Sequence, residues 1–218
     1  MTFKTALLLC CSITISYAKP QITSFHSLDK ISAYAQTKKE FPSIDNTSWN
    51  KPDYSSFFKK EKLSFFTKIA QSLLVRKKTE WSANILKKLL SKATLIYKNN
   101  GLGPKTIVKI NTKKDGKIFI WGDLQGAFHS LVRDFLKLKD MRVIDDDLKI
   151  LNPQHYIVFN GDAINRSPYS LETLSLILLL ITNNPKQVFY ARGNHEHENH
   201  FDFGIKNELR FKARSVSN

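Results

Sequence analysis

Three short segments decide the fold of this chain: residues 121–126 (WGDLQG), 160–166 (NGDAINR) and 192–196 (RGNHE). Each follows directly after an apolar run and combines a glycine with a side chain that offers an oxygen or nitrogen ligand. A glycine at such a place lets the backbone turn sharply and come close to whatever is bound. One Gly-Asp pair is a common turn, but three such segments in order indicate a site built where strands end.

The residues around these segments predict alternating strands and helices. Apolar, β-branched and aromatic residues predict four strands, at 106–110, 117–121, 156–159 and 187–190. A hairpin turn is expected at 113–116, between the first two strands. Amphipathic spacing predicts a helix over 128–138, and the apolar run 171–181 predicts a buried helix. This β-β-α-β-α-β order predicts a layered α/β fold with functional loops at the strand ends.

The segment 117–196 resembles the N-terminal half of the calcineurin-like metallophosphoesterases. Their pattern is Gly-Asp-x-His-Gly, then Gly-Asp-x-x-Asp-Arg-Gly, then Gly-Asn-His-Glu or Gly-Asn-His-Asp. Gln125 stands where most of the family has a metal-binding histidine, and Asn165 where the phosphoprotein phosphatases have aspartate. Both variants, with the run 165–174 (NRSPYSLETL), are similar to the symmetrical diadenosine tetraphosphate hydrolases. The form of residues 192–196 is nearer the protein phosphatases, so the subfamily is mixed.

The resemblance implies a layered α-β-β-α metallophosphoesterase sandwich that holds two divalent metal ions, which are Mn, Fe, Zn or Mg. Asp123 would bind the first ion and Asp162 would bridge both, because a carboxylate has oxygens enough for two cations. Asn194 would offer its side-chain carbonyl to the second ion. Gln125 would give the first ion an amide oxygen, which is a weaker donor than imidazole.

The resemblance also implies catalytic roles for four further residues. His195 would serve as general acid or as an electrostatic partner of the leaving group. Arg166 and Arg192 are suited to grip phosphate oxygens with two hydrogen bonds each. Asn165 would orient His195 by a hydrogen bond, but it cannot stabilise an imidazolium by charge as an aspartate would.

Each motif residue also has an ordinary structural interpretation. Asp123 and Asp162 can cap the helices that follow them, and Asn194 can be a left-handed turn residue. His197 and His200 can replace missing metal ligands, although a histidine-rich surface turn is favoured. Glu196 and Glu198 are expected at the start of the next helix or on its solvated face. Three motifs in order nevertheless favour the family fold.

The regions outside the motifs divide the chain. Residues 1–18 read as a cleaved signal peptide that exports the protein to the periplasm or beyond, with an N-terminal anchor or a buried segment as alternatives. Residues 19–53 are expected to form a loosely ordered polar leader or linker, and residues 54–104 a basic amphipathic helical segment. Residues 105–218 would be the N-terminal half of the metallophosphoesterase domain.

Charge and composition limit the partners. The 218 residues carry 34 Lys and Arg against 19 Asp and Glu, a net charge of +15, which favours anionic partners such as phosphorylated substrates. No nucleic-acid motif is present, so a nucleic-acid binder is disfavoured. The helices of 54–104 are expected to pack on the domain through their apolar stripe, with docking to a membrane or a partner as the alternative.

The chain stops about twenty residues after Glu196, with no histidine beyond His200. We therefore expect a C-terminally truncated domain: a fragment, a decayed copy, or a chain that a partner completes. The predicted function is a metal-dependent phosphoesterase that hydrolyses phosphate monoesters or anhydrides, of phosphoprotein or dinucleoside polyphosphate type. The alternative is a catalytically weak or inactive protein of the same fold with a partner- or membrane-binding role.

Overall fold

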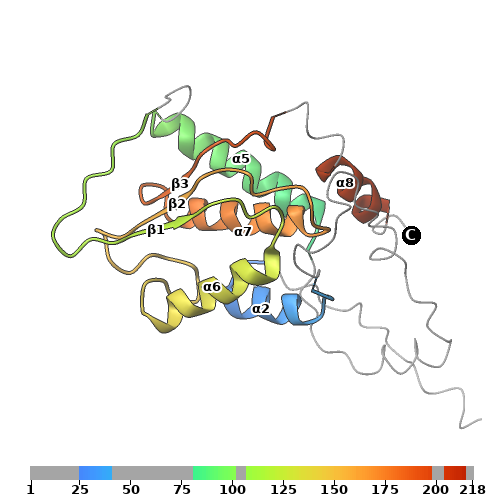
Figure 1. Ribbon diagram of the computed structural model, residues 1–218, viewed down its shortest axis with the longest axis horizontal. Coiled ribbons are helices and arrows are strands. Elements are labelled where there is room, and N and C mark those ends of the chain that lie inside the picture. The colour runs from blue at the N-terminus through green and yellow to red at the C-terminus, as the bar shows by residue number, and fades with distance from the viewer. Residues whose placement is uncertain (1–24, 41–80, 102–106, 198–203, 215–218) are drawn as a thin grey trace, which may run out of the picture.

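The computed structural model describes residues 25–40, 81–101, 107–197 and 204–214, and Figure 1 shows their arrangement. Three strands and five helices follow one another along these residues. They are α2 (Leu28–Gln36), α5 (Ala83–Asn99), β1 (Ile118–Trp121), α6 (Phe128–Asp140), β2 (Tyr156–Phe159), α7 (Ser170–Asn183), β3 (Val188–Tyr190) and α8 (Ile205–Arg214). The predicted signal peptide at 1–18 and the first part of the predicted helical segment, at 54–80, lie outside the described residues.

The three strands form one parallel sheet in the order β1-β2-β3. Trp121 pairs with Phe159, and Phe159 pairs with Tyr190, so the strands end in register. Parallel strands present their carboxyl ends at one edge of the sheet. The sheet therefore brings the three motif segments to the same edge, and the α/β prediction is confirmed.

The apolar surfaces of α6 and α7, the helices that connect the strands, match the neighbours on which each helix packs. The helix α6 buries an apolar stripe that begins at Phe128 and ends at Leu138, and Phe135 packs its ring on Trp121 of β1. The helix α7 contacts α5, α6, α8 and β3, which explains why it is apolar nearly all round. Both helices lie where the sequence predicted them, and so do β2 and β3.

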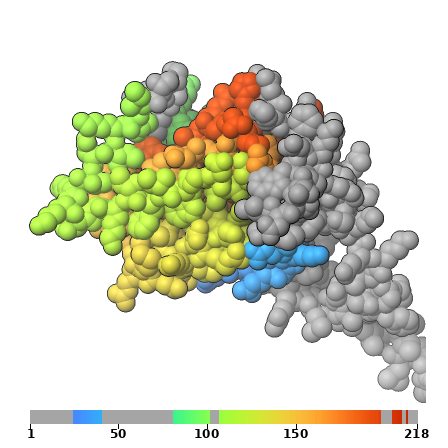
Figure 2. Space-filling model, viewed as in Figure 1, coloured from blue at the N-terminus to red at the C-terminus, as the bar shows by residue number. Residues whose placement is uncertain are grey.

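The turn predicted at 113–116 is present, with the Gly116 N–H donating to the Lys113 carbonyl oxygen at 2.9 Å, but the strand predicted before it is wrong. Residues 107–110 are not a strand, and Ile107 is 83% exposed. The segment before β1 runs along the outside of the molecule, in light green at one end of Figures 1 and 2. A β-branched run forms a strand only where a neighbouring surface buries one face of it, and none of the described residues does so here. The second sheet of the expected sandwich is not among the described residues.

The prediction of a loosely ordered leader at 19–53 is also wrong for the residues of this range that the structure describes. Residues 28–36 form α2, which lies beside α6, and Leu28 and Ile31 are fully buried. Phe25 stacks on Phe128 at 6.1 Å between ring centroids. The apolar residues of 28–36 recur at helical steps. The stretch is short and the residues between them are polar, so its composition did not indicate a helix.

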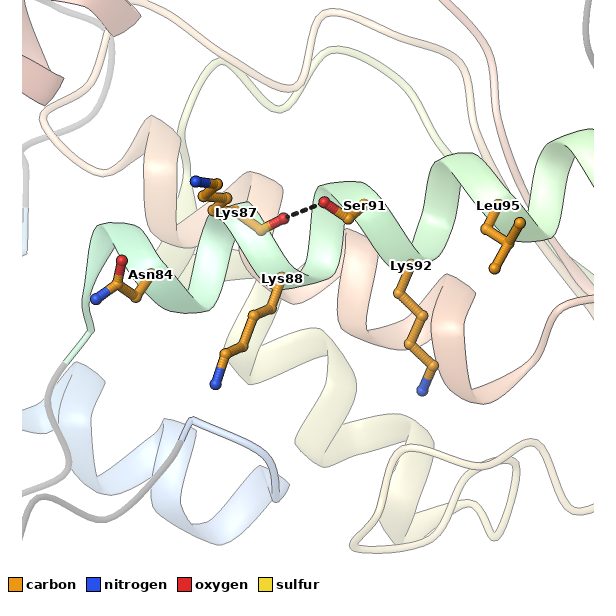
Figure 3. Close-up of a pocket in the computed structure, with 6 residues that line it drawn as sticks. All are labelled: Asn84, Lys87, Lys88, Ser91, Lys92 and Leu95. Carbon is orange, nitrogen blue, oxygen red and sulfur yellow. Dashed lines mark hydrogen bonds between the residues drawn. The ribbon is translucent and has the colours of Figure 1, made fainter.

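The helix α5 is the described part of the predicted basic segment. Ser82 caps its N-terminus by accepting a hydrogen bond from the Ile85 N–H at 3.4 Å. Leu86, Leu89 and Ala93 are buried, and the helix packs along α7. The opposite side carries lysines around a shallow hollow, shown in Figure 3 and lined by Asn84, Lys87, Lys88, Ser91, Lys92 and Leu95. No helix within the described ranges is long and apolar enough to cross a membrane.

A buried ionic cluster joins α8 to the rest of the domain. Lys212 of α8 donates to Glu172 of α7 and, at 2.7 Å, to Glu208 of α8. Both carboxylates are fully buried. Tyr34 of α2 donates to Glu172 at 2.8 Å, so three helices meet at this cluster. Burial, which outweighs the attraction of Lys212, raises the pKa of Glu208 to about 7.

This raised pKa predicts a specific pH dependence of stability. Glu208 is faced by Lys212 and Glu172, with Tyr34 and Tyr169 nearby, and its pKa lies above the ordinary value of 4.5. The folded state holds the proton more tightly than the unfolded chain, so this contribution to stability is complete below about pH 4.5. It is lost as the pH rises through about 7. Denaturant unfolding should show the free energy of unfolding falling more steeply over that window in the wild type than in Glu208→Gln. Parallel pH profiles for the two proteins would contradict this assignment.

Candidate active site

The three motif segments meet at Asp162. The backbone N–H groups of Leu124 and Gln125 donate to the Asp162 carbonyl oxygen at 3.0 and 2.8 Å. The His195 N–H donates to the Asp162 carboxylate at 2.8 Å. The first and third segments are thus both hydrogen-bonded to the second, as the sequence predicted for residues at neighbouring strand ends.

Backbone strain is concentrated at this meeting point. Six non-glycine residues within the described ranges have a positive φ, and four of them lie in the first two motif segments: Gln125 (48°), Asp162 (50°), Asn165 (74°) and Arg166 (56°). Such conformations are unfavourable for residues other than glycine. They persist where surrounding contacts hold the backbone in place, which is common at functional sites.

Two motif glycines are required by the close approach of the second and third segments. A Cβ on Gly161, whose φ is +92°, would lie 2.3 Å from the backbone nitrogen of Gly193. A Cβ on Gly193 would lie 2.1 Å from the Asp162 carboxylate. Neither position has room for a side chain, so these glycines allow the contact that brings His195 to Asp162.

Glu196 holds the second and third segments together. Its carboxylate accepts hydrogen bonds from the N–H groups of Asp162 and Ala163 at 2.8 Å each and of Gly193 at 2.9 Å. The Tyr190 hydroxyl donates to it at 2.7 Å, and burial together with this carboxylate raises the pKa of Tyr190. The prediction that Glu196 lies at the start of the next helix or on its solvated face is therefore wrong, and Glu198 lies outside the described residues. The place of Glu196 directly after the Gly-Asn-His motif was the signal available in the sequence.

His195 lies between two residues of the second segment. Its Nδ1 is 3.2 Å from the Asn165 side-chain nitrogen, and its Nε2 is 3.4 Å from an Arg166 guanidinium nitrogen. The Asn165 oxygen accepts from the Ile205 N–H at 3.1 Å, which orients the amide with its nitrogen toward the ring. Asn165 therefore presents its amide nitrogen to Nδ1, and the Arg166 guanidinium presents an N–H to Nε2. The charged guanidinium beside the imidazole ring can also bind an anionic oxygen.

The predicted metal ligands fit hard cations. The Gln125 side-chain oxygen is buried and, among the described residues, has no hydrogen-bond partner. Buried polar atoms ordinarily have a partner, and a bound hard cation would supply one to this amide oxygen. Asp123 and Asn194 are exposed at the same edge of the sheet, and Arg192 is exposed there too. No group of three or more His, Cys, Asp or Glu side chains placed to hold a metal ion occurs in the described part of the chain, and His197 is exposed. The donors present are carboxylate and amide oxygens.

Comparison with known proteins agrees with this geometry. Residues 116–217 match the family model of the calcineurin-like phosphoesterases. The chain is 31% identical over 103 residues to serine/threonine-protein phosphatase T of Saccharomyces cerevisiae, covering 47% of this chain and 18% of that protein. It is 37% identical over 79 residues to the PP2A-like serine/threonine-protein phosphatase PPG1 of Candida albicans, covering 36% and 16%.

Among solved structures, a serine/threonine phosphatase from Saccharomyces cerevisiae with similarity to human PP5 matches with a TM-score of 0.44 and 24% identity. The match covers 68% of this chain and 43% of that one. The chain spans less than a fifth of the length of these two curated relatives. The match over residues 116–217 confirms the resemblance to the calcineurin-like phosphoesterases that the sequence predicted.

Proposed function

We propose that this chain carries part of the active site of a metal-dependent phosphoesterase that removes phosphate from phosphorylated serine and threonine residues of proteins. The observation that carries the proposal is the buried, unpartnered oxygen of Gln125, which lies in the segment bonded to the Asp162 backbone. A buried amide oxygen without a partner is unfavourable by about 1–3 kcal/mol unless something else binds it. A divalent cation at this edge of the sheet would be that partner.

The residues divide into two groups in this proposal. Asp123, Gln125, Asp162 and Asn194 would hold the divalent ions, which supply charge stabilisation to the attacking and leaving oxygens when they are bound. The Arg166 guanidinium, next to the His195 ring, would donate to phosphate oxygens. Arg192, exposed at the same edge, would bind a further oxygen, and Asn165 would orient His195 through the contact with Nδ1.

The substrate class rests on two observations. The relatives reported above are serine/threonine-protein phosphatases. The net charge of +15 favours phosphorylated, acidic protein segments over neutral ones. We therefore place phosphoprotein ahead of dinucleoside polyphosphate as the substrate.

The test is a matched pair of variants at Gln125, assayed with p-nitrophenyl phosphate over a manganese titration. Gln125→His replaces the amide by a stronger donor, and Gln125→Asn keeps the amide but withdraws its oxygen by one methylene. Both residues tolerate the positive φ of this position. We expect half-saturation at roughly tenfold lower manganese in Gln125→His and at roughly tenfold higher manganese in Gln125→Asn.

Calorimetric titration with manganese alone should give the same order of affinities. If all three proteins half-saturate at the same manganese concentration, Gln125 is not a metal ligand. If the wild type shows no manganese-dependent turnover with the small ester or with a phosphopeptide, the proposed activity is wrong for this chain.

A further inference from the structure

The helix α8 contacts the second motif segment through Ile205 and the start of α7 through Glu208. The Ile205 N–H donates to the Asn165 side-chain oxygen, and the Glu208 carboxylate accepts from the Ser170 N–H at 2.9 Å and the Leu171 N–H at 3.1 Å. A Cβ on Gly204 would lie 2.0 Å from the Asn165 oxygen, so this approach leaves no room for a side chain there. α8 is therefore in direct contact with the loop that joins the motif to α7.

Glu208 takes the place of a capping residue for α7. The N-cap residue Tyr169 makes no side-chain cap hydrogen bond. The first N–H groups of a helix have no partner within the helix and carry partial positive charge. Glu208, which is fully buried, supplies a carboxylate to two of them from a different helix.

Ser170 links this cap to the candidate active site. Its hydroxyl accepts from the Asn165 N–H at 2.9 Å and donates to the Ser167 carbonyl oxygen at 3.1 Å. Lys212 also donates to the Pro168 carbonyl oxygen at 2.9 Å. These bonds hold the turn in which Asn165 and Arg166 both have a positive φ, and those two residues face the two ring nitrogens of His195.

We infer that Glu208 is a positioning residue for the Asn165–Arg166 turn, so that docking of α8 aligns Arg166 and Asn165 with His195. Glu208 touches no reacting atom and acts through Ser170. The consequence for turnover rests on the proposed function, whereas the consequence for the turn does not. The metal-binding residue Asp162 is held by a separate set of bonds, from Glu196, so the two effects can be separated.

Hydrogen–deuterium exchange of the full chain tests the structural step. The variants are Glu208→Gln, which keeps the shape but removes the charge and one acceptor oxygen, and Ser170→Ala, which breaks the same path at its other end. Lys206→Gln, an exposed position of α8, is the matched control. We expect the peptide covering 164–172 to exchange on the order of tenfold faster in both variants, because each removes a buried hydrogen bond. The peptide covering β2 should be unchanged.

Turnover of p-nitrophenyl phosphate tests the functional step. Both variants should lower kcat by on the order of tenfold and leave the half-saturating manganese concentration within about twofold of the wild type. Unchanged exchange at 164–172 in both variants would overturn the inference, as would an equal loss of protection in β2, which would mean general destabilisation. A wild type without turnover refutes the proposed function, and the exchange result still decides the role of Glu208.

Discussion

Asp162→Asn is expected to reduce turnover of a phosphate monoester by at least about a thousandfold while leaving the fold intact. Asparagine tolerates the positive φ of this position, and its oxygen can still accept the hydrogen bond from the His195 N–H. The substitution therefore removes one negative charge and little else. A carboxylate that bridges two cations has no neutral substitute of equal strength, so manganese binding should be lost together with turnover.

The matched control is Asp140→Asn, which makes the same chemical change at an exposed residue at the end of α6. Circular dichroism and thermal unfolding should show both variants folded. Turnover that is unaltered in Asp162→Asn would remove this residue from the active site. Loss of turnover with unaltered manganese binding would assign Asp162 a role other than metal binding.

The parts of the fold that the sequence predicted are those encoded locally. The strand at 156–159 and the helix at 171–181 are apolar runs of the right lengths, bounded by turn residues, and the structure has both. The motif segments follow strands that turned out to be parallel neighbours, so their convergence on Asp162 followed from the order of elements alone. Local pattern and strand order thus predicted that the three motif segments meet at one edge of the sheet.

The parts that sequence reasoning missed depend on contacts between distant residues. Nothing near residue 208 in the sequence indicates that Glu208 caps α7, because its partners are Ser170 and Leu171. The orientation of the Asn165 amide is decided by the Ile205 N–H, forty residues away. The sequence could show that Asn165 lacks a charge, but not that it donates to His195 rather than accepting from it.

The burial of two charged side chains could not be predicted from the sequence either. Glu172 is the single charged residue of the apolar run 171–181, and Lys212 lies in a stretch rich in charged residues. Glu172 is nevertheless fully buried, and the Lys212 side chain is 14% exposed. Their pairing across 40 residues is what permits burial, because an isolated charge in such a place is strongly unfavourable. Pairing of this kind cannot be predicted from the periodicity of either helix.

Lys212→Met is therefore expected to destabilise the protein by about 3–5 kcal/mol, the second large effect. The ammonium group donates to Glu172, Glu208 and the Pro168 carbonyl oxygen, and it lies over the Tyr169 ring at 5.4 Å from the centroid. Methionine fills similar volume without the charge, so the two buried carboxyl groups would lose the cation that compensates them. Denaturant unfolding at neutral pH measures the loss, and Lys206→Met on the exposed side of α8 is the control.

The double variant Lys212→Met, Glu172→Gln separates lost charge compensation from lost packing. The glutamine oxygen can still accept from the Tyr34 hydroxyl, and the cluster then contains one carboxylate instead of two. If the destabilisation arises from uncompensated charge, the double variant should be more stable than Lys212→Met alone, and the loss in Lys212→Met should shrink at mildly acidic pH as Glu208, whose pKa is raised by burial, binds a proton. A double variant no more stable than the single one, with a loss independent of pH, would show that Lys212 contributes by packing against the Tyr169 ring and its neighbours rather than by its charge.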